Sequence, residues 1–140
     1  MPPGSPFYEV IETAAAARIV SRYACGGNGP PRDSAGQPYF RPYSNVTRGQ
    51  LAKIVVIAAS ITRGWTVINP AHPAFGDVPA GSVFYEFVET AYCHGVLSGY
   101  TCGAGEACPG TYFRPGAQAT RGPIAKIVYG AVTAAGSCAP

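Results

Sequence analysis

The chain has 140 residues, of which 47% are apolar and only 12% are charged, and its formal net charge is +3. This length suits one domain, or two small units that share a core, and so few charges indicate a surface that is small or largely covered by neighbours. The arginines and lysines are dispersed, which argues against binding to nucleic acid. The most apolar run, 51–61, is interrupted by Lys53 and is too short for membrane insertion.

The first predicted element is a helix that begins at Ser5 and Pro6. Serine is a favoured N-cap and proline a favoured first helical residue. Phe7, Ile11 and Ala14 then recur at helical spacing. We expect an apolar stripe with a small-residue end, which another helix can approach closely.

The second predicted helix runs from Arg48 to about Ser60. Thr47 is its expected N-cap, and Gln50 completes a capping box three residues later. Gly64 is its expected end. The β-branched run 54–57 is poor for an isolated helix, so tertiary packing must hold this segment.

The same pattern then occurs a second time. Residues 39–59 match residues 112–132 at 12 of 21 positions, and residues 7–27 match residues 84–104 at 10 of 21. The offset between the copies is 77 residues in the earlier window and 73 in the later one, because the second copy has a shorter Gly/Pro-rich loop. Such self-similarity predicts two copies of one supersecondary unit.

The predicted fold is therefore mainly α with short extended connectors, built from two helix–loop–helix repeats packed on each other. The first repeat is expected at 1–64, truncated at its start, and a linker with the second repeat at 65–140. In the second copy Ser82 and Thr120 are the expected caps. Gly95 is the expected end of that copy's first helix.

Two backbone expectations concern arginines. Arg18 stands where the second copy has Gly95, so the same backbone would strain the first copy by roughly 1 kcal/mol. Each Tyr-Phe-Arg-Pro segment places an arginine, Arg41 or Arg114, before a proline. Proline favours an extended conformation in the residue that precedes it.

The five cysteines leave several pairings open. Cys102 and Cys108 flank a short Gly-rich loop, where a disulfide is geometrically easy; the alternative is two reduced thiols. Cys93 lies in a predicted helix and is expected to be a buried free thiol. Cys25 and Cys138 then lack local partners and would pair with each other or across subunits.

Several motifs of the second half follow one another in a fixed order: Phe75-Gly-Asp77-Val78-Pro79, Gly95-Val-Leu-Ser-Gly99, Phe113-Arg-Pro115 and Ala119-Thr120-Arg121-Gly122. This order resembles the S-layer homology (SLH) repeat, whose pattern is F-x-D-V, a helix, G-I-x-x-G, F-x-P, and V-T-R-A/G before a second helix. The resemblance covers nearly the whole chain. It implies a mostly helical module of an extracellular bacterial protein, commonly one that anchors proteins to cell-wall polysaccharide.

The chain departs from the SLH pattern at three points. SLH anchors usually have three repeats, whereas this chain has two. The acidic residue of the glycan-binding T-R-A-E motif is replaced by Gln50 in one copy and Pro123 in the other. A Phe-x-Asp precedes only the second repeat, at Phe75 and Asp77.

The candidate ligand residues are Arg48 and Arg121, each beside its cap, Thr47 or Thr120. A guanidinium at a helix N-terminus suits an anionic saccharide, because the free amides and the cation attract the same group. The alternative is that both are surface arginines beside a structural cap.

Catalysis has little support in the sequence. His72 lies in a Pro-rich linker, and His94 is expected at a helix end, where a cationic ring would favour the helix dipole. Glu86 and Glu89 form a pair one turn apart, expected to be exposed. None of these residues has the spacing of a catalytic triad or a metal site. We expect neither enzyme activity nor a metal or cofactor.

Two functional hypotheses remain. The favoured one is an extracellular structural subunit that assembles with copies of itself into a filament or surface layer, because a two-unit repeat chain without polar caps leaves open ends. The other is an anchor module that binds anionic cell-wall polysaccharide, as the SLH resemblance implies. Both place the protein at a cell surface, in a bacterium.

Overall fold

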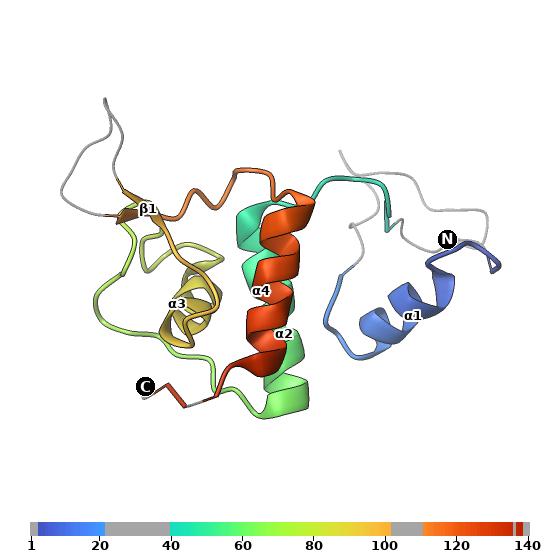
Figure 1. Cartoon of the computed structure of the whole chain (residues 1–140), viewed down its shortest axis with the longest axis horizontal. Helices are drawn as coiled ribbons and strands as arrows, with labels where there is room; N and C mark the ends of the chain where they lie inside the picture. Colours follow the sequence, from blue (N-terminus) through green and yellow to red (C-terminus); the bar gives the residue numbers. More distant parts are fainter. Residues whose placement is uncertain (1–2, 22–39, 102–110, 136, 139–140) are drawn as a thin grey trace. The chain divides into compact units, whose positions relative to one another are not determined.

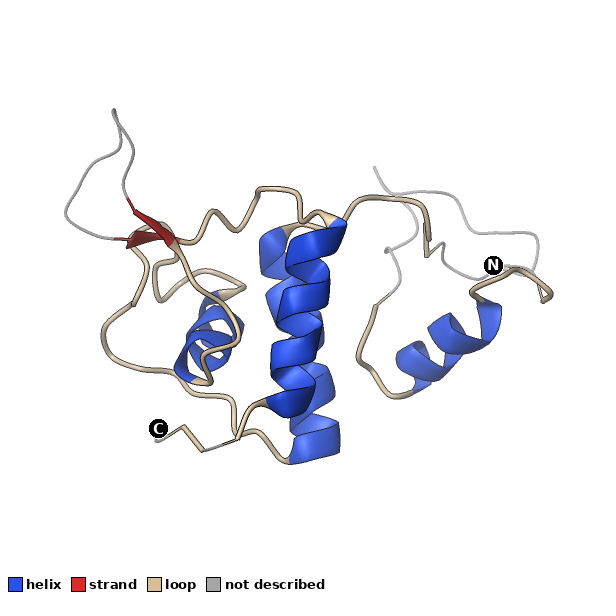
Figure 2. Cartoon of the chain, in the orientation of Figure 1, coloured by secondary structure: helices blue, strands red, loops and turns tan. Residues whose placement is uncertain are grey.

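The computed structural model describes residues 3–21, 40–101, 111–135 and 137–138. The described part is mostly helical, with one short hairpin (Figure 2), which confirms the prediction of helices joined by short extended connectors. Its elements in chain order are α1 (Tyr8–Ala16), α2 (Arg48–Arg63), α3 (Tyr85–Cys93), β1 (Tyr100–Thr101), β2 (Thr111–Tyr112) and α4 (Arg121–Thr133). None of the described helices is both long and apolar enough to cross a membrane.

Two compact units make up the chain, Met1–Ser44 and Asn45–Pro140. The first contains α1, and the second contains every other element. Within the second unit α2 packs against both α3 and α4 (Figure 1), while β1 and β2 pair antiparallel with Tyr100 opposite Tyr112. The second helix of the first repeat therefore shares a core with the second repeat. The predicted boundary between the two sequence repeats at residue 64 stays a prediction.

The capping box of α2 is confirmed. The Gln50 amide donates to the Thr47 hydroxyl at 3.3 Å, and the Thr47 amide donates to the Gln50 side chain at 3.0 Å. The helix ends at Gly64, which is left-handed with φ 69°. It runs to Arg63, beyond the expected end near Ser60, because Gly64 is the first residue that breaks the pattern.

The predicted serine caps of α1 and α3 are wrong. Each helix begins after a phenylalanine in the N-cap position, Phe7 or Phe84, and neither helix has a side-chain cap. The serines lie one turn earlier: the carbonyls of Ser5 and Ser82 accept hydrogen bonds from the amides three residues later. The two copies thus share the same tight turn before the helix. In both copies the serine lies too early in the chain to be the N-cap residue.

The helix ends behave as the repeat predicts. Gly95 follows α3 with φ 70°. Arg18, its counterpart after α1, has φ 58°. A non-glycine residue in this conformation costs roughly 1–2 kcal/mol, so the predicted strain in the first copy is present.

The core of the second unit is built around α2. Val56, Val88 and Phe113 are fully buried, and each such side chain contributes about 1.5–3 kcal/mol relative to an exposed one. At the start of α2, Gly49 lets α3 approach closely, since the ring of Phe84 lies 2.6 Å from the point that a Cβ at Gly49 would occupy. A larger residue at this position would push α3 away.

Candidate functional site

The N-terminus of α2 is covered by the loop that precedes α4. The Arg48 amide donates to the Ala117 carbonyl at 2.8 Å, and the Gly49 amide donates to the Pro115 carbonyl at 2.9 Å. The first amides of a helix have no acceptor within the helix. Here carbonyls of the chain occupy the place in which an anionic ligand would otherwise bind.

The side chain of Arg48 is buried in the same junction, with only 8% of the residue exposed. Its Nε donates to the Phe113 carbonyl at 2.8 Å, and its Nη2 donates to the Ser98 carbonyl at 3.1 Å. The guanidinium carbon lies 4.6 Å and 4.8 Å from the ring centroids of Phe113 and Tyr100. Arg48 is thus a clamp that joins α2 to two separate segments of the second repeat.

The loop that Arg48 holds is fixed from its other side by Asp77. The two carboxylate oxygens of Asp77 accept from the amides of Phe113 and Arg114, at 2.8 Å and 2.7 Å. Arg114 has φ 59°, and Arg41, its counterpart, has φ 57°. The expectation that a following proline keeps these arginines extended is wrong. In the second copy the paired bonds to Asp77 offset the cost of the strained turn.

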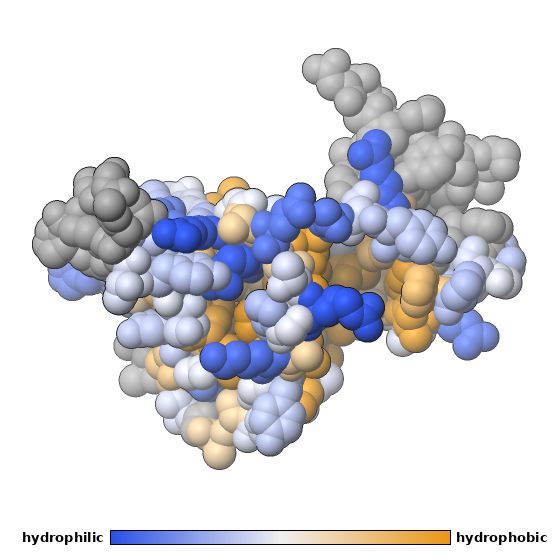
Figure 3. Space-filling model, turned by 45° about the horizontal axis from the view of Figure 1, so that its top comes forward, coloured by the Kyte–Doolittle hydropathy of each residue, from blue (hydrophilic) through white to orange (hydrophobic). Residues whose placement is uncertain are grey.

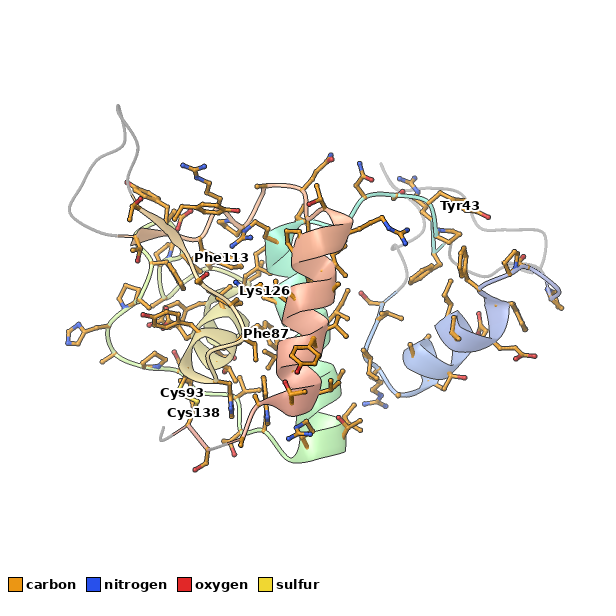
Figure 4. All side chains as sticks on the ribbon, viewed as in Figure 1. Tyr43, Phe87, Cys93, Phe113, Lys126 and Cys138 are labelled. Atoms are coloured by element: carbon orange, nitrogen blue, oxygen red, sulfur yellow. A yellow bond between two sulfur atoms is a disulfide. The ribbon has the colours of Figure 1, made fainter. Side chains whose placement is uncertain are left out.

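A cavity of about 320 Å³ opens beside this junction. Its lining includes Arg48, Leu97 and Tyr100, and Gly122 and Lys126 from α4. A lining that contains two cationic residues and a tyrosine suits an anionic sugar, which combines negative charge with an apolar ring face. Figure 4 labels Lys126, which lies on α4, and Phe113, which follows β2.

Thr120 and Arg121, the second predicted pair of ligand residues, are not among the residues that line this cavity. Thr120 holds the N-cap position of α4 but makes no side-chain cap hydrogen bond. The reason is that Pro123 stands at the position whose amide would donate to the threonine, and proline has no amide hydrogen. The expected N-cap position of Thr120 is therefore confirmed, but its side chain does not cap the helix. Arg121 is exposed. A ligand role for Arg48, Arg121, Thr47 and Thr120 stays a prediction.

A disulfide joins Cys93, the last residue of α3, to Cys138 (Figure 4). The prediction of a buried free thiol at Cys93 is wrong, and so is the pairing of Cys138 with Cys25 or across subunits. Arg63 helps to place the bond, because its guanidinium donates to the carbonyls of Val132 and Ala134 at 2.7 Å and 2.8 Å. It holds the segment after α4 beside the end of α2. The other candidates, Cys25, Cys102 and Cys108, lie outside the described residues, so the Cys102–Cys108 bond stays a prediction.

His94 stacks on Trp65, with ring centroids 3.7 Å apart and an angle of 4° between the planes. Its Nε2 is buried, and no group in the described part of the chain bonds to it. Burial lowers the pKa of His94, because the charged ring would lose its hydration. His94 lies at the C-cap of α3, as expected, but its lowered pKa favours the neutral ring over the cationic ring that the helix dipole would favour.

The expected exposed pair of carboxylates is also corrected. Glu86 is exposed, but Glu89 is buried and accepts a hydrogen bond from the Ala74 amide at 2.8 Å. Burial raises the pKa of Glu89, and the bond from Ala74 opposes that rise. Glu89 thus ties the linker to α3. Across the described ranges, no group of three or more His, Cys, Asp or Glu residues could hold a metal ion.

No family model matches the chain, and no curated protein matches it significantly. The resemblance to SLH repeats rests on the motifs of the chain alone.

Proposed function

We propose that the chain is a non-enzymatic structural subunit of the SLH type, which assembles with copies of itself into a filament or surface layer outside a bacterial cell. The proposal is carried by one observation on the two equivalent helices, α2 and α4. They have matching sequences, yet seven residues of α2 are buried and only two of α4 are.

The difference lies on one face of the helix. Val56 and Ala59 of α2 are buried, whereas their counterparts on α4, Tyr129 and Val132, expose 69% and 58% of their surface. Apolar side chains also stand among polar ones at the surface in Figure 3. Large exposed apolar groups along one face are typical of a surface that binds a partner.

Two further features support a subunit of an extracellular assembly. The low share of charged residues fits a protein whose surface is largely covered by neighbours. The disulfide between Cys93 and Cys138 fits an oxidising compartment, since such bonds are rare in the bacterial cytosol.

The test is the state of the purified full-length chain. Size-exclusion chromatography, sedimentation and negative-stain electron microscopy should show polymers, with the same preparation examined with and without a reductant. A species that stays at the 14.5 kDa of one chain over a wide range of protein concentration would refute self-assembly.

A second candidate function is an anchor that binds anionic cell-wall polysaccharide, and the cavity beside Arg48 and Lys126 favours it. Lys126→Ala should weaken co-sedimentation with wall polysaccharide under this hypothesis. Lys53→Ala is the matched control, because Lys53 is the counterpart of Lys126 in the first repeat and its Nζ lies 5.5 Å from the centroid of the Phe87 ring instead. Equal binding by both variants and the wild type would exclude this cavity as the sugar site.

A further inference from the structure

We infer that the Cys93–Cys138 disulfide is a site of covalent modification by a small thiol, which attacks Cys93 and releases Cys138 from a cavity beside Trp65. The bond lies within the second unit and joins the last residue of α3 to a residue beyond α4 (Figure 4). The reaction needs only a single chain. The inference therefore goes beyond the proposed self-assembly and does not depend on it.

A cavity of about 240 Å³ lies beside the disulfide. Its lining combines Arg63, Trp65 and His94 with residues that follow α4. Three of the latter are called here the tail residues: Ala135, Ser137 and Cys138. The cavity is thus closed by parts of the chain that are distant in sequence and that the disulfide joins.

The disulfide is what fastens the tail residues. Arg63 fixes the chain only as far as Ala134, whose carbonyl accepts a bond from the guanidinium at 2.8 Å. Within the described ranges, the tail residues make no hydrogen bond to the rest of the chain. Breaking the S–S bond therefore frees the tail residues, while the end of α4 stays fastened by Arg63.

Exposure favours attack at Cys93. Exchange begins when a thiolate attacks one of the two sulfurs of a disulfide, and access helps to decide which sulfur is attacked. Cys93 is an exposed residue, whereas Cys138 is half-buried. An incoming thiol therefore meets the Cys93 side of the bond first.

The charge of Arg63 favours the same direction. Attack at Cys93 makes Cys138 the leaving thiolate, and Cys138 lines the same cavity as Arg63. The described lining residues include no carboxylate, and burial lowers the pKa of His94, which keeps that ring neutral. A neighbouring cation lowers the pKa of a thiol, and a thiol of lower pKa leaves faster.

Attack at Cys138 is opposed by the position of Cys93. Cys93 would then have to leave as a thiolate at the last residue of α3. The C-terminal end of a helix carries partial negative charge, which destabilises an anion there. Exposure, the Arg63 cation and the α3 dipole thus all select Cys93 as the sulfur that is attacked.

The exchange step balances with the thiol as the only co-reactant. The sulfur of the thiolate forms a bond to Sγ of Cys93, the Cys93–Cys138 bond breaks, and its electron pair leaves on Sγ of Cys138. The incoming sulfur is oxidised to the disulfide level and Cys138 is reduced, with water supplying the proton that the thiolate takes up. The product is a mixed disulfide at Cys93 with the tail residues released. Trp65, only 8% exposed before the reaction, then loses part of its cover.

The first test maps the attacked sulfur. The oxidised full-length chain is treated briefly with limiting 2-mercaptoethanol, a thiol whose lack of charge does not bias its approach. The mixture is quenched with acid, alkylated with N-ethylmaleimide and mapped by peptide mass spectrometry. We expect the mercaptoethanol adduct on Cys93 and the maleimide on Cys138, with Cys93 favoured by about fivefold or more. Equal adducts, an adduct chiefly on Cys138, or no adduct on either would overturn the inference.

Two comparisons test whether the fold causes this preference. In urea the cavity and the α3 dipole are lost, so the ratio of Cys93 adduct to Cys138 adduct should fall toward one. Arg63→Gln removes the cation beside Cys138 and should lower the ratio in the folded chain. Arg121→Gln is the matched control, an exposed arginine that is not among the lining residues, and should leave the ratio unchanged. A ratio that is the same in all four samples would overturn the inference.

The second test measures the release of the tail residues. Trp65 is the only tryptophan of the chain, so quenching of its fluorescence by acrylamide reports the exposure of this ring. Modification at Cys93, or Cys138→Ser, should raise the quenching constant and shift the emission to longer wavelength, with the far-UV circular dichroism unchanged. Unchanged quenching would show that the tail residues stay in place. A lost far-UV signal would show that the bond holds the whole unit folded, and either result would overturn a local release.

Discussion

Arg48→Ala tests whether the first Thr-Arg-Gly motif is a structural clamp. The substitution removes a buried guanidinium and leaves the carbonyls of Phe113 and Ser98 without their donors. Each unsatisfied buried carbonyl costs about 1–3 kcal/mol, and each lost cation–π contact about 0.5–1 kcal/mol. We expect the free energy of unfolding of the second unit to fall by roughly 3–5 kcal/mol.

Arg121→Ala is the matched control, because Arg121 has the same neighbours in sequence but is exposed. A surface substitution of this kind changes stability by no more than about 0.5 kcal/mol. Arg48→Lys adds a third point, since lysine keeps the charge but lacks the planar fork that reaches two carbonyls. The free energy of unfolding that Arg48→Lys loses should lie between the losses of Arg48→Ala and Arg121→Ala.

Urea unfolding followed by far-UV circular dichroism and Trp65 fluorescence measures all three variants. All three variants are measured at two protein concentrations, because a contribution from assembly depends on concentration and folding of a single chain does not. A cost below about 1 kcal/mol for Arg48→Ala, or equal costs for Arg48→Ala and Arg121→Ala, would refute the clamp. Arg48 would then be available for a ligand.

Three further predictions concern the second unit. Reducing the Cys93–Cys138 bond, or replacing Cys138 by serine, should lower the free energy of unfolding by roughly 4 kcal/mol, given the length of chain it closes; an unchanged urea midpoint in reductant would contradict this. Because burial lowers the pKa of His94, the unfolded chain binds a proton that the folded ring does not, so stability is complete above the ordinary histidine pKa of about 6.5 and falls as the pH decreases through it. His94→Phe should flatten that part of the pH profile, and an unaltered slope would assign it to another group. Asp77→Ala should cost about 2–4 kcal/mol by removing two charge-assisted bonds to backbone amides, with exposed Glu86→Ala as the control that should leave the midpoint in place.

Local signals predicted much of the backbone. The Thr47 and Gln50 pair identified the start of α2, and Gly64 and Gly95 identified two helix ends. The conformation of Arg18 followed from aligning it with Gly95. These features depend on residues close in sequence, where steric limits and capping chemistry act directly.

Features that depend on residues distant in sequence were not predicted. The partner of Cys138 depends on how the chain runs after α4, which Arg63 fixes across 69 residues. The turn at Arg114 depends on Asp77, a carboxylate 37 residues away. The N-cap position of Thr120 was predicted from its place before Arg121 and Gly122, and the missing bond from its hydroxyl follows from Pro123, which has no amide hydrogen.

The two Thr-Arg-Gly motifs show why the candidate site could not be assigned from a motif. Their sequences are the same, yet Arg48 is buried among carbonyls and Arg121 is exposed, since α2 has the loop before α4 and the helix α3 packed on it. A Thr-Arg-Gly motif at a helix N-terminus therefore offers hydrogen-bond donors. It does not determine whether a sugar or a peptide segment supplies the acceptors. The loop after β2 supplies the acceptors for the first motif, through the carbonyls of Phe113, Pro115 and Ala117. A peptide backbone can therefore satisfy this array of donors as well as an anionic sugar can.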